Sequence, residues 1–329
     1  MKLLLLIGLS RPRFEFVKRN SGKLGALLLV LLMSFPGLCQ VSVTVKTDRV
    51  SVEINGQPFT SLYKGADAHK PFLHPLLTAS GKAVTRAFPM EHVEGEPVDH
   101  PHQRGLWMGF EHLSGMNFWE LDPADPHPRM GTIAFRDVLE SHSGKQTGGF
   151  TTTADWITPE GKSVIEQTLT LTFYAEPRDV RSFDVDLRLK AKATVTFEDT
   201  RDGIVGIRLA PLFDEANGGK VRNAEGVTGA AHIESTHSPW VDWQTDLQGE
   251  TVGVAILDHP QNRRAPTTWI LRPNCLVFAN PFAQRYYSRA LPDGSMTMQP
   301  GDELRLRYRV IIHPAGFDIG QAFREFSTQ

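Results

Sequence analysis

The sequence predicts an all-β protein whose main domain is a large antiparallel β-sandwich. Apolar and polar residues alternate in three segments, at 168–173, 183–189 and, apart from Ile311, 304–313. A period of two residues is typical of strands with one buried and one polar face. Turn dipeptides separate the strand-like segments, and only the C-terminal tail has helical spacing. The ~290 residues of this kind exceed an immunoglobulin-sized unit, so we expect one large sandwich of long strands.

The first 39 residues are predicted to be an export signal. Six basic residues and one acidic residue precede an apolar run over residues 24–35. This run is shorter than the ~20 residues that span a membrane, and a small-residue cleavage site would follow it. We therefore expect residues 1–39 to be a bacterial signal peptide that is cleaved near Cys39, with an uncleaved anchor or a lipoprotein as alternatives. Residues 41–329 then form a single secreted or periplasmic domain with no membrane span.

The net charge argues against a nucleic acid partner, and the cysteine content argues against a disulfide. The whole chain has a formal charge of −2, and loss of the signal removes six basic residues and one acidic residue, which brings the charge to −7. Such a domain repels phosphate backbones, so we expect no nucleic acid partner. Cys275 is the one cysteine that remains beyond Cys39. An intramolecular disulfide is therefore excluded in the mature chain.

The expected elements follow in order along the chain. Residues 50–54 and 58–60 flank Asn55-Gly56, a dipeptide typical of two-residue hairpin turns. Glu160-Gly161 and Asp293-Gly294 mark further hairpins, and the three alternating segments are strands. Behind a capping Asp318, the tail carries apolar residues at helical spacing, namely Ile319, Ala322, Phe323 and Phe326.

The densest polar stretch covers residues 94–107 and holds three carboxylates, two imidazoles, a guanidinium and an indole. Its two prolines keep it out of a sheet interior, so we expect a solvent-accessible loop or strand end. Histidines beside carboxylates suit general acid–base catalysis. His100 and His102 are therefore candidate catalytic residues, with Glu96 and Asp99 as orienting carboxylates. A loop clamp that holds two strands together is the alternative.

Part of this stretch is repeated later in the chain. Residues 99–104 and 258–263 share the pattern Asp-His-Pro-x-x-Arg. If two corresponding loops meet over one cleft, His100 and His259 approach each other; a chance repeat is the alternative. A metal site with His100, His102 and His259 as three nitrogen ligands competes with the acid–base hypothesis. The spacing does not decide between them, so the metal and any cofactor stay unknown.

Tryptophans accompany both polar segments. Sugar rings stack on indoles, and a cleft that combines Trp with Arg, Asn and His suits a carbohydrate. The candidate substrate-binding residues are Arg104, Trp107, Trp119, His259, Asn262, Trp269 and Asn280. Core positions for the tryptophans are the alternative. Arg104, Arg263 and Arg272 could instead hold the carboxylate of an acidic sugar.

Motifs along nearly the whole mature chain resemble a bacterial extracytoplasmic family. The resemblance rests on residues 70–75, 84–86, 99–107, 117–119, 253–260, 280–282 and 308–313. These motifs are similar to those of the "PmoA family", labelled methane oxygenase PmoA and otherwise treated as a domain of unknown function. The resemblance implies a fold similar to the galactose-mutarotase-like supersandwich and a carbohydrate substrate.

The sequence departs from the usual family motif in two places. Gln103 stands where a third histidine is common, and residues 273–275 lack the usual glycine. The first departure leaves His100 and His102 to carry any proton transfer. The oxygenase label does not fit the predicted fold, because the similarly named methane monooxygenase subunit is a multi-helix membrane protein.

Together these observations predict a secreted or periplasmic carbohydrate-active protein. We expect an enzyme (an epimerase, lyase or hydrolase) that uses histidine and carboxylate acid–base chemistry on a sugar or oligosaccharide. A non-catalytic glycan-binding protein and a metal-dependent oxygenase are the alternatives. The order of these hypotheses rests on the polar stretch at 94–107 and on the tryptophans near it.

Overall fold

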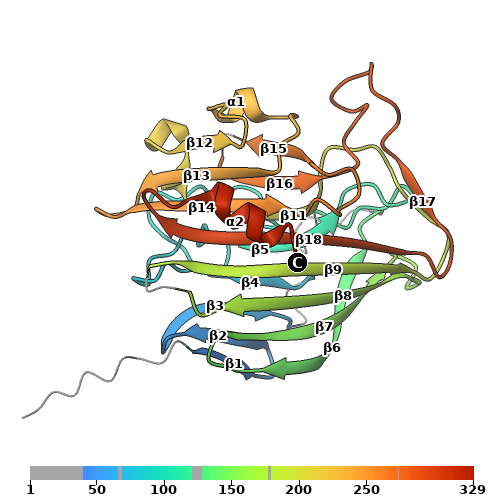
Figure 1. Cartoon of the computed structure of the whole chain (residues 1–329). Helices are drawn as coiled ribbons and strands as arrows, with labels where there is room; N and C mark the ends of the chain where they lie inside the picture. The colour runs from blue at the N-terminus through green and yellow to red at the C-terminus, as the bar shows by residue number, and fades with distance from the viewer. Residues whose placement is uncertain (1–39, 66–68, 121–127, 177–178, 273) are drawn as a thin grey trace, which may run out of the picture. The chain divides into compact units, whose positions relative to one another are not determined.

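Two eight-stranded antiparallel sheets pack face to face in the computed structural model (Figure 1). The structure describes residues 40–65, 69–120, 128–176, 179–272 and 274–329. The predicted all-β sandwich is confirmed, and its large sheets agree with the supersandwich that the resemblance implied. The predicted export signal, residues 1–39, lies outside the described residues.

The first sheet has the strand order β1-β2-β3-β4-β5-β11-β16-β15. The predicted hairpin at Asn55-Gly56 joins β2 to β3, and both turn residues have a positive φ, of 57° and 73°. Such angles match a turn with two left-handed residues. The strands are β1 (Val41–Val45), β2 (Arg49–Ile54), β3 (Gln57–Tyr63), β4 (Phe72–His74), β5 (Leu106–Phe110), β11 (Gly203–Arg208), β16 (Leu276–Asn280) and β15 (Thr268–Arg272).

The second sheet has the strand order β12-β13-β14-β18-β9-β8-β7-β6. The three alternating segments of the sequence are β8, β9 and β18, and Glu160-Gly161 joins β7 to β8 as predicted. The strands are β12 (Lys220–Asn223), β13 (Trp240–Asp246), β14 (Thr251–Asp258), β18 (Glu303–Pro314), β9 (Arg181–Ala191), β8 (Ser163–Tyr174), β7 (Thr147–Ile157) and β6 (Thr132–His142).

The hairpin predicted at Asp293-Gly294 is wrong. These residues lie in the long connection between β16 and β17 (Met296–Met298), and β17 pairs with the distant β10 (Val195–Phe197). The Gly294 N–H donates to the carboxylate of Asp199 at 2.7 Å. A long-range contact therefore fixes this turn, and the dipeptide carries no information about such a contact.

Alternation within each strand divides the apolar residues among three layers. The main core lies between the sheets and includes Leu169 and Leu171 of β8 together with Val205 and Ile207 of β11. A second cluster covers the outer face of the first sheet and comprises Phe72, Trp107, Trp119, Ile270, Leu276, Phe278 and Ala283. A third cluster covers the outer face of the second sheet, where α2 packs.

The predicted C-terminal helix is confirmed as α2 (Ile319–Phe326). Asp318 caps it, accepting a hydrogen bond from the Gln321 N–H at 2.9 Å. The apolar side of α2 packs on Ala255, Leu257 and Ile311 of the second sheet (Figure 1). The short elements are η2 (Pro211–Phe213), η3 (Glu215–Asn217) and α1 (Ala230–Ile233). None of the helices in the described ranges is both long and apolar enough to cross a bilayer.

Candidate functional site

A pocket of about 380 Å³ lies over the outer face of the first sheet. The segments that bound it precede β5, follow β5, precede β11 and connect β15 to β16. Because β5, β11, β16 and β15 are neighbours in the sheet, these segments converge. The residues that line the pocket are His100, His102, Gln103, Trp119, Glu120, Arg201, Asp202, Arg272, Asn274 and Leu276.

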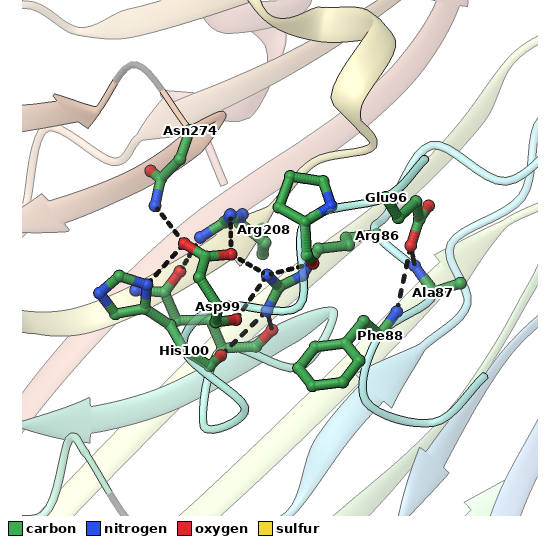
Figure 2. A network of polar contacts seen from close by, with 10 residues as sticks. Arg86, Ala87, Phe88, Glu96, Asp99, His100, Arg208 and Asn274 are labelled. Carbon is green, nitrogen blue, oxygen red and sulfur yellow. Dashed lines mark hydrogen bonds and ion pairs between the residues drawn. The ribbon is translucent and has the colours of Figure 1, made fainter. Parts of the chain in front are cut away.

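Arg86 organises the loop that carries the two histidines. Its guanidinium is buried and donates to the backbone carbonyls of Asp99 at 2.7 Å and of His100 at 2.9 Å, and to the Asp99 carboxylate at 2.6 Å (Figure 2). At the end of the loop, Gly105 has φ of 52°, and a Cβ there would lie 2.0 Å from the Leu73 carbonyl oxygen. A buried cation and a glycine therefore determine the path of the loop.

Asp99 is held from several sides. Its carboxylate accepts from Arg86 at 2.6 Å, Arg208 at 2.8 Å and the Asn274 amide at 3.3 Å. Desolvation raises the pKa of Asp99, but the hydrogen bond to His100 and the charges of Arg208 and Arg86 lower it overall, to about 2. Asp99 is therefore an ionised hydrogen-bond acceptor and does not carry a proton near neutral pH.

His100 is oriented by this carboxylate. Its Nδ1 lies 2.6 Å from Asp99 Oδ2, and the imidazole side chain is about half exposed (Figure 2). An ionised carboxylate only accepts hydrogen bonds, so Nδ1 carries the proton and Nε2 of the neutral ring is the basic nitrogen. No described residue accepts from or donates to Nε2 of His100. The pair is therefore an imidazole base with a fixed tautomer at the pocket wall.

His102 has a different role from the one expected. Its side chain is buried, and its ring lies edge-on to His100 with the two centroids 5.6 Å apart. Burial, followed by the charge of Lys70, lowers the pKa of His102 to about 2. The ring is therefore neutral and cannot donate a proton as an imidazolium near neutral pH. The prediction that the stretch at 94–107 is solvent-accessible is therefore wrong at His102.

An indole pair lies beneath the pocket, and Trp119 is the member that lines it. Trp107 and Trp119 have ring centroids 5.0 Å apart, and a Cβ at Gly206 of β11 would come within 2.7 Å of the Trp119 ring. Glycine at this position therefore leaves room for the indoles against the sheet. The Nζ of Lys70 lies over the face of Trp107 at 5.2 Å and donates to the backbone carbonyl of Trp119. Lys70 thus adds a buried positive charge beneath the pocket.

Two arginine–carboxylate pairs belong to the other side of the pocket. Arg201 donates to Asp202 through Nε at 2.8 Å and Nη2 at 2.9 Å. Arg272 lies 2.8 Å from the carboxylate of Glu234, and the Tyr287 hydroxyl is 3.5 Å from Arg272 Nη2. Because Asp202 binds Arg201 bidentately and Glu234 and Tyr287 both contact Arg272, the two guanidinium groups are held in place. They therefore suit recognition of a polar ligand.

Glu96 is not an orienting carboxylate. Its Oε2 accepts from the backbone N–H groups of Ala87 at 3.0 Å and Phe88 at 3.2 Å, and Figure 2 shows it turned away from Asp99. The side chain lines a separate cavity of about 620 Å³ on the other side of the loop. Glu96 therefore supports the loop, and Asp99 alone orients His100.

The predicted approach of His100 and His259 is wrong. The His259 ring contacts Phe326 of α2 with centroids 5.0 Å apart, on the outer face of the second sheet. His100 belongs to the pocket on the outer face of the first sheet. Asn262 is also remote from the pocket, since its amide holds Asp258 at 2.7 Å and the Arg307 carbonyl at 2.6 Å. The second Asp-His-Pro segment is a loop clamp.

Several predicted binding residues have structural roles. Trp269 is buried in the main core and donates from Nε1 to the Ser238 carbonyl at 2.7 Å. Trp107 and Trp119 are both almost completely buried, and of the predicted tryptophans Trp119 alone lines the pocket. Asn280 is buried and donates to the Thr200 and Arg201 carbonyls.

Neither Arg104 nor the predicted set of three histidine ligands forms the site expected from the sequence. Arg104 donates to the Pro101 carbonyl at 3.0 Å and lies 5.6 Å from the Phe72 ring. The set His100, His102 and His259 is not brought together, because His259 is on the opposite face. The described residues contain no group of three His, Cys, Asp or Glu side chains placed to hold a metal ion.

Sequence reasoning missed several residues that the structure places in or behind the pocket. Lys70 and Arg86 stand in the motifs that carried the family resemblance, and this was the available signal for them. Arg201 and Asp202 had no such signal, and Asn274 was noted only as part of residues 273–275, where the usual glycine is missing. Gln103, set aside as a poor catalytic candidate, lines the pocket and accepts from the buried Arg208.

Comparison with known proteins gives a family but no activity. A family model described as "Family of unknown function (DUF6807)" matches residues 49–326, and that description does not mention PmoA. A search of curated proteins returned no match. Among solved structures, one described as "Putative kojibiose phosphorylase from human microbiome" is similar over 60% of this chain and 23% of that chain, at 8% identity and a TM-score of 0.32. This chain therefore spans less than a quarter of the phosphorylase.

Proposed function

We propose that this chain, which belongs to the DUF6807 family of unknown function, is a carbohydrate-active enzyme in which His100 is the acid–base residue. The observation that carries the proposal is the His100–Asp99 pair at the wall of a polar pocket. Asp99 fixes the proton on Nδ1, so Nε2 can take a proton from a sugar hydroxyl or a sugar carbon and return it later. Epimerisation, elimination and hydrolysis all need such a group.

The lining of the pocket supports a sugar as ligand. It combines one indole, that of Trp119, with amide, guanidinium and carboxylate groups from four segments. A pyranose presents apolar C–H faces surrounded by hydroxyls, and these need the same mixture of partners. His102, which stays neutral, is suited to hydrogen bonding with a hydroxyl. Its environment equally suits the alternative of a non-catalytic glycan-binding protein.

We also propose that the chain is exported and acts in the periplasm or outside the cell. A charged segment followed by an apolar run at residues 24–35 supports export. N-terminal sequencing of the exported protein should give a start near Gln40. An intact Met1 in the membrane fraction would contradict export of a cleaved chain.

The experiment compares the wild type with His100→Gln on a panel of neutral and acidic oligosaccharides, together with elemental analysis of the purified protein. Loss of a positioned base should lower kcat by ~100- to 10,000-fold. The affinity for substrate and the melting temperature should stay close to those of the wild type, because His100 is half exposed. His142→Gln, the same change at an exposed position of β6, is the matched control and should keep full activity.

Three outcomes contradict the proposal in different ways. Sugar binding without turnover by the wild type indicates the glycan-binding alternative. A bound metal with oxygen uptake indicates the oxygenase that the PmoA label suggests. Full turnover by His100→Gln removes His100 from the mechanism.

A further inference from the structure

Tyr286 is the one exposed aromatic side chain among the described residues. Its exposed fraction is 53%, whereas every other Phe, Tyr and Trp side chain in the described part of the chain is buried or half-buried. Covering an aromatic ring contributes more to folding than covering most other side chains, so a ring left in water is uncommon. The face of the Tyr286 ring is therefore accessible to a ligand, and its position decides which one.

Tyr286 lies beside the pocket on the first sheet. Its ring contacts that of Tyr287, with centroids 5.1 Å apart. Tyr287 packs against the apolar cluster on the outer face of this sheet, and its hydroxyl is 3.5 Å from Nη2 of Arg272, which lines the pocket. The hydrogen bond to Asp202 is the main cause of the raised pKa of Arg201, another lining residue, and the Tyr286 phenol contributes from nearby. The exposed ring is therefore next to the arginine side of the pocket.

The loop that carries Tyr286 is anchored to the segment that carries Arg201. Asp199 lies two residues before Arg201, and its carboxylate accepts hydrogen bonds from four backbone N–H groups of the connection between β16 and β17. The four donors are Gln284 at 3.1 Å, Arg285 at 2.7 Å, Tyr286 at 3.0 Å and Gly294 at 2.7 Å. The backbone of Tyr286 is thus fixed before a ligand arrives, so stacking on its ring requires little ordering of the loop.

The pocket itself has room for about one sugar ring. Its volume of about 380 Å³ lies near the lower end of the ~300–1,000 Å³ that is usual for small-ligand sites. A second ring linked to the first therefore lies outside the pocket. On the arginine side this second ring meets the exposed face of Tyr286, on which the C–H face of a pyranose can stack.

We infer that the ligand is a chain of at least two sugar rings, with one ring in the pocket and the next stacked on Tyr286. This inference rests on the proposed carbohydrate function and adds the class of substrate. The substrate is an oligosaccharide or the end of a polysaccharide, and a free monosaccharide fills only part of the site. Stacking uses C–H surface and tolerates different hydroxyl patterns, so the second subsite should accept several sugars.

The test measures by calorimetry the affinity of the mature wild type for mono- and disaccharides. The ligands are the methyl glycosides of glucose, galactose, mannose and xylose and those of their α- and β-linked disaccharides. Every oligosaccharide of the panel above that binds is likewise compared with its constituent monosaccharides. A ring stacked on Tyr286 should make at least one disaccharide bind ~5-fold or more tightly than its monosaccharide. The same measurements on His100→Gln exclude a contribution from turnover.

Two variants assign the second ring to Tyr286. Tyr286→Ala should lower the affinity for the disaccharide to that for its monosaccharide and leave the monosaccharide affinity unchanged. Tyr286→Phe keeps the aromatic face and should retain most of the preference. Leu139→Ala is the matched control, because Leu139 is an exposed apolar side chain on β6 of the second sheet. It should bind both ligands like the wild type.

Equal affinity of the wild type for every monosaccharide and its disaccharides would overturn the inference and leave the proposed function standing. A preference that Tyr286→Ala retains would also overturn it, because the second ring would then lie elsewhere. Binding of none of these ligands, nor of any oligosaccharide in the panel, would overturn the proposed function itself. The comparison among ligands uses the wild type alone, so it stays decisive even if a variant fails to fold.

Discussion

At the residue scale, the sequence Asp-His-Pro occurs twice, and the aspartates of the two copies, Asp99 and Asp258, have opposite surroundings. Asp99 is partly exposed and faces two buried guanidinium groups, which keep it ionised. Asp258 is buried, and its donors among the described residues are the Asn262 amide and the Thr267 N–H, each at 2.7 Å. Desolvation raises the pKa of Asp258 to about 7. The same Asp-His-Pro sequence therefore gives a charged orienting group in one loop and a buried carboxyl that retains its proton up to near neutral pH in the other.

The raised pKa predicts a specific pH dependence of stability. The unfolded carboxyl titrates near pH 4 and the folded one near pH 7. Between these values the folded state holds a proton that the unfolded state has lost. The contribution of Asp258 to the free energy of unfolding is thus complete below pH 4 and falls by about 1.4 kcal/mol per pH unit as the pH rises toward 7.

Urea unfolding of the wild type and of Asp258→Asn at pH 5, 6 and 7 measures this contribution. Asparagine cannot titrate. The unfolding free energy of the wild type should therefore fall relative to that of Asp258→Asn as the pH rises. Burial lowers the pKa of His74 to about 4 and that of His102 to about 2, but these effects are common to both proteins and cancel in the difference. A difference that is constant over this range would contradict the assignment.

At the element scale, the strands were predictable because their signal is local. Alternation in β8, β9 and β18 and the Asn55-Gly56 turn each depend on a few adjacent residues. The end cap of α2 has the same property. These are the features that the structure confirms.

The site itself was only partly predictable because it depends on sheet order. Placing β11 between β5 and β16 brings Arg201, Asp202 and Asn274 to the loop that carries His100. No local pattern encodes that order. Likewise, the alternation of β14 turns Leu257 outward, and His259 two residues later follows onto the same outer face. The repeat of Asp-His-Pro-x-x-Arg suggested a shared cleft because sequence alone does not show which face each copy occupies.

At the scale of the whole molecule, the two outer faces of the sandwich differ in what covers them. The outer face of the second sheet is packed by α2 over an apolar cluster. The outer face of the first sheet carries the indole pair and the polar pocket above it. This asymmetry is the basis for assigning function to the first sheet.

A competing cavity tests that assignment. It has a volume of about 570 Å³, larger than the pocket at His100, and it lies beside β12 and β13 of the second sheet. Its lining includes Arg222, His232 and Asp242. However, the Asp242 carboxylate is already occupied by Arg222 at 3.1 Å, Gln244 at 2.6 Å and His313 at 3.1 Å. The cavity beside β12 and β13 therefore has less capacity for a polar ligand than the pocket at His100.

A crystal structure of the mature chain soaked with the saccharide that binds most tightly would locate the binding site. We expect the sugar ring beside Trp119, with a hydroxyl or a carbon-bound hydrogen near Nε2 of His100. A sugar bound in the cavity beside β12 and β13, with the pocket at His100 empty, would contradict this expectation.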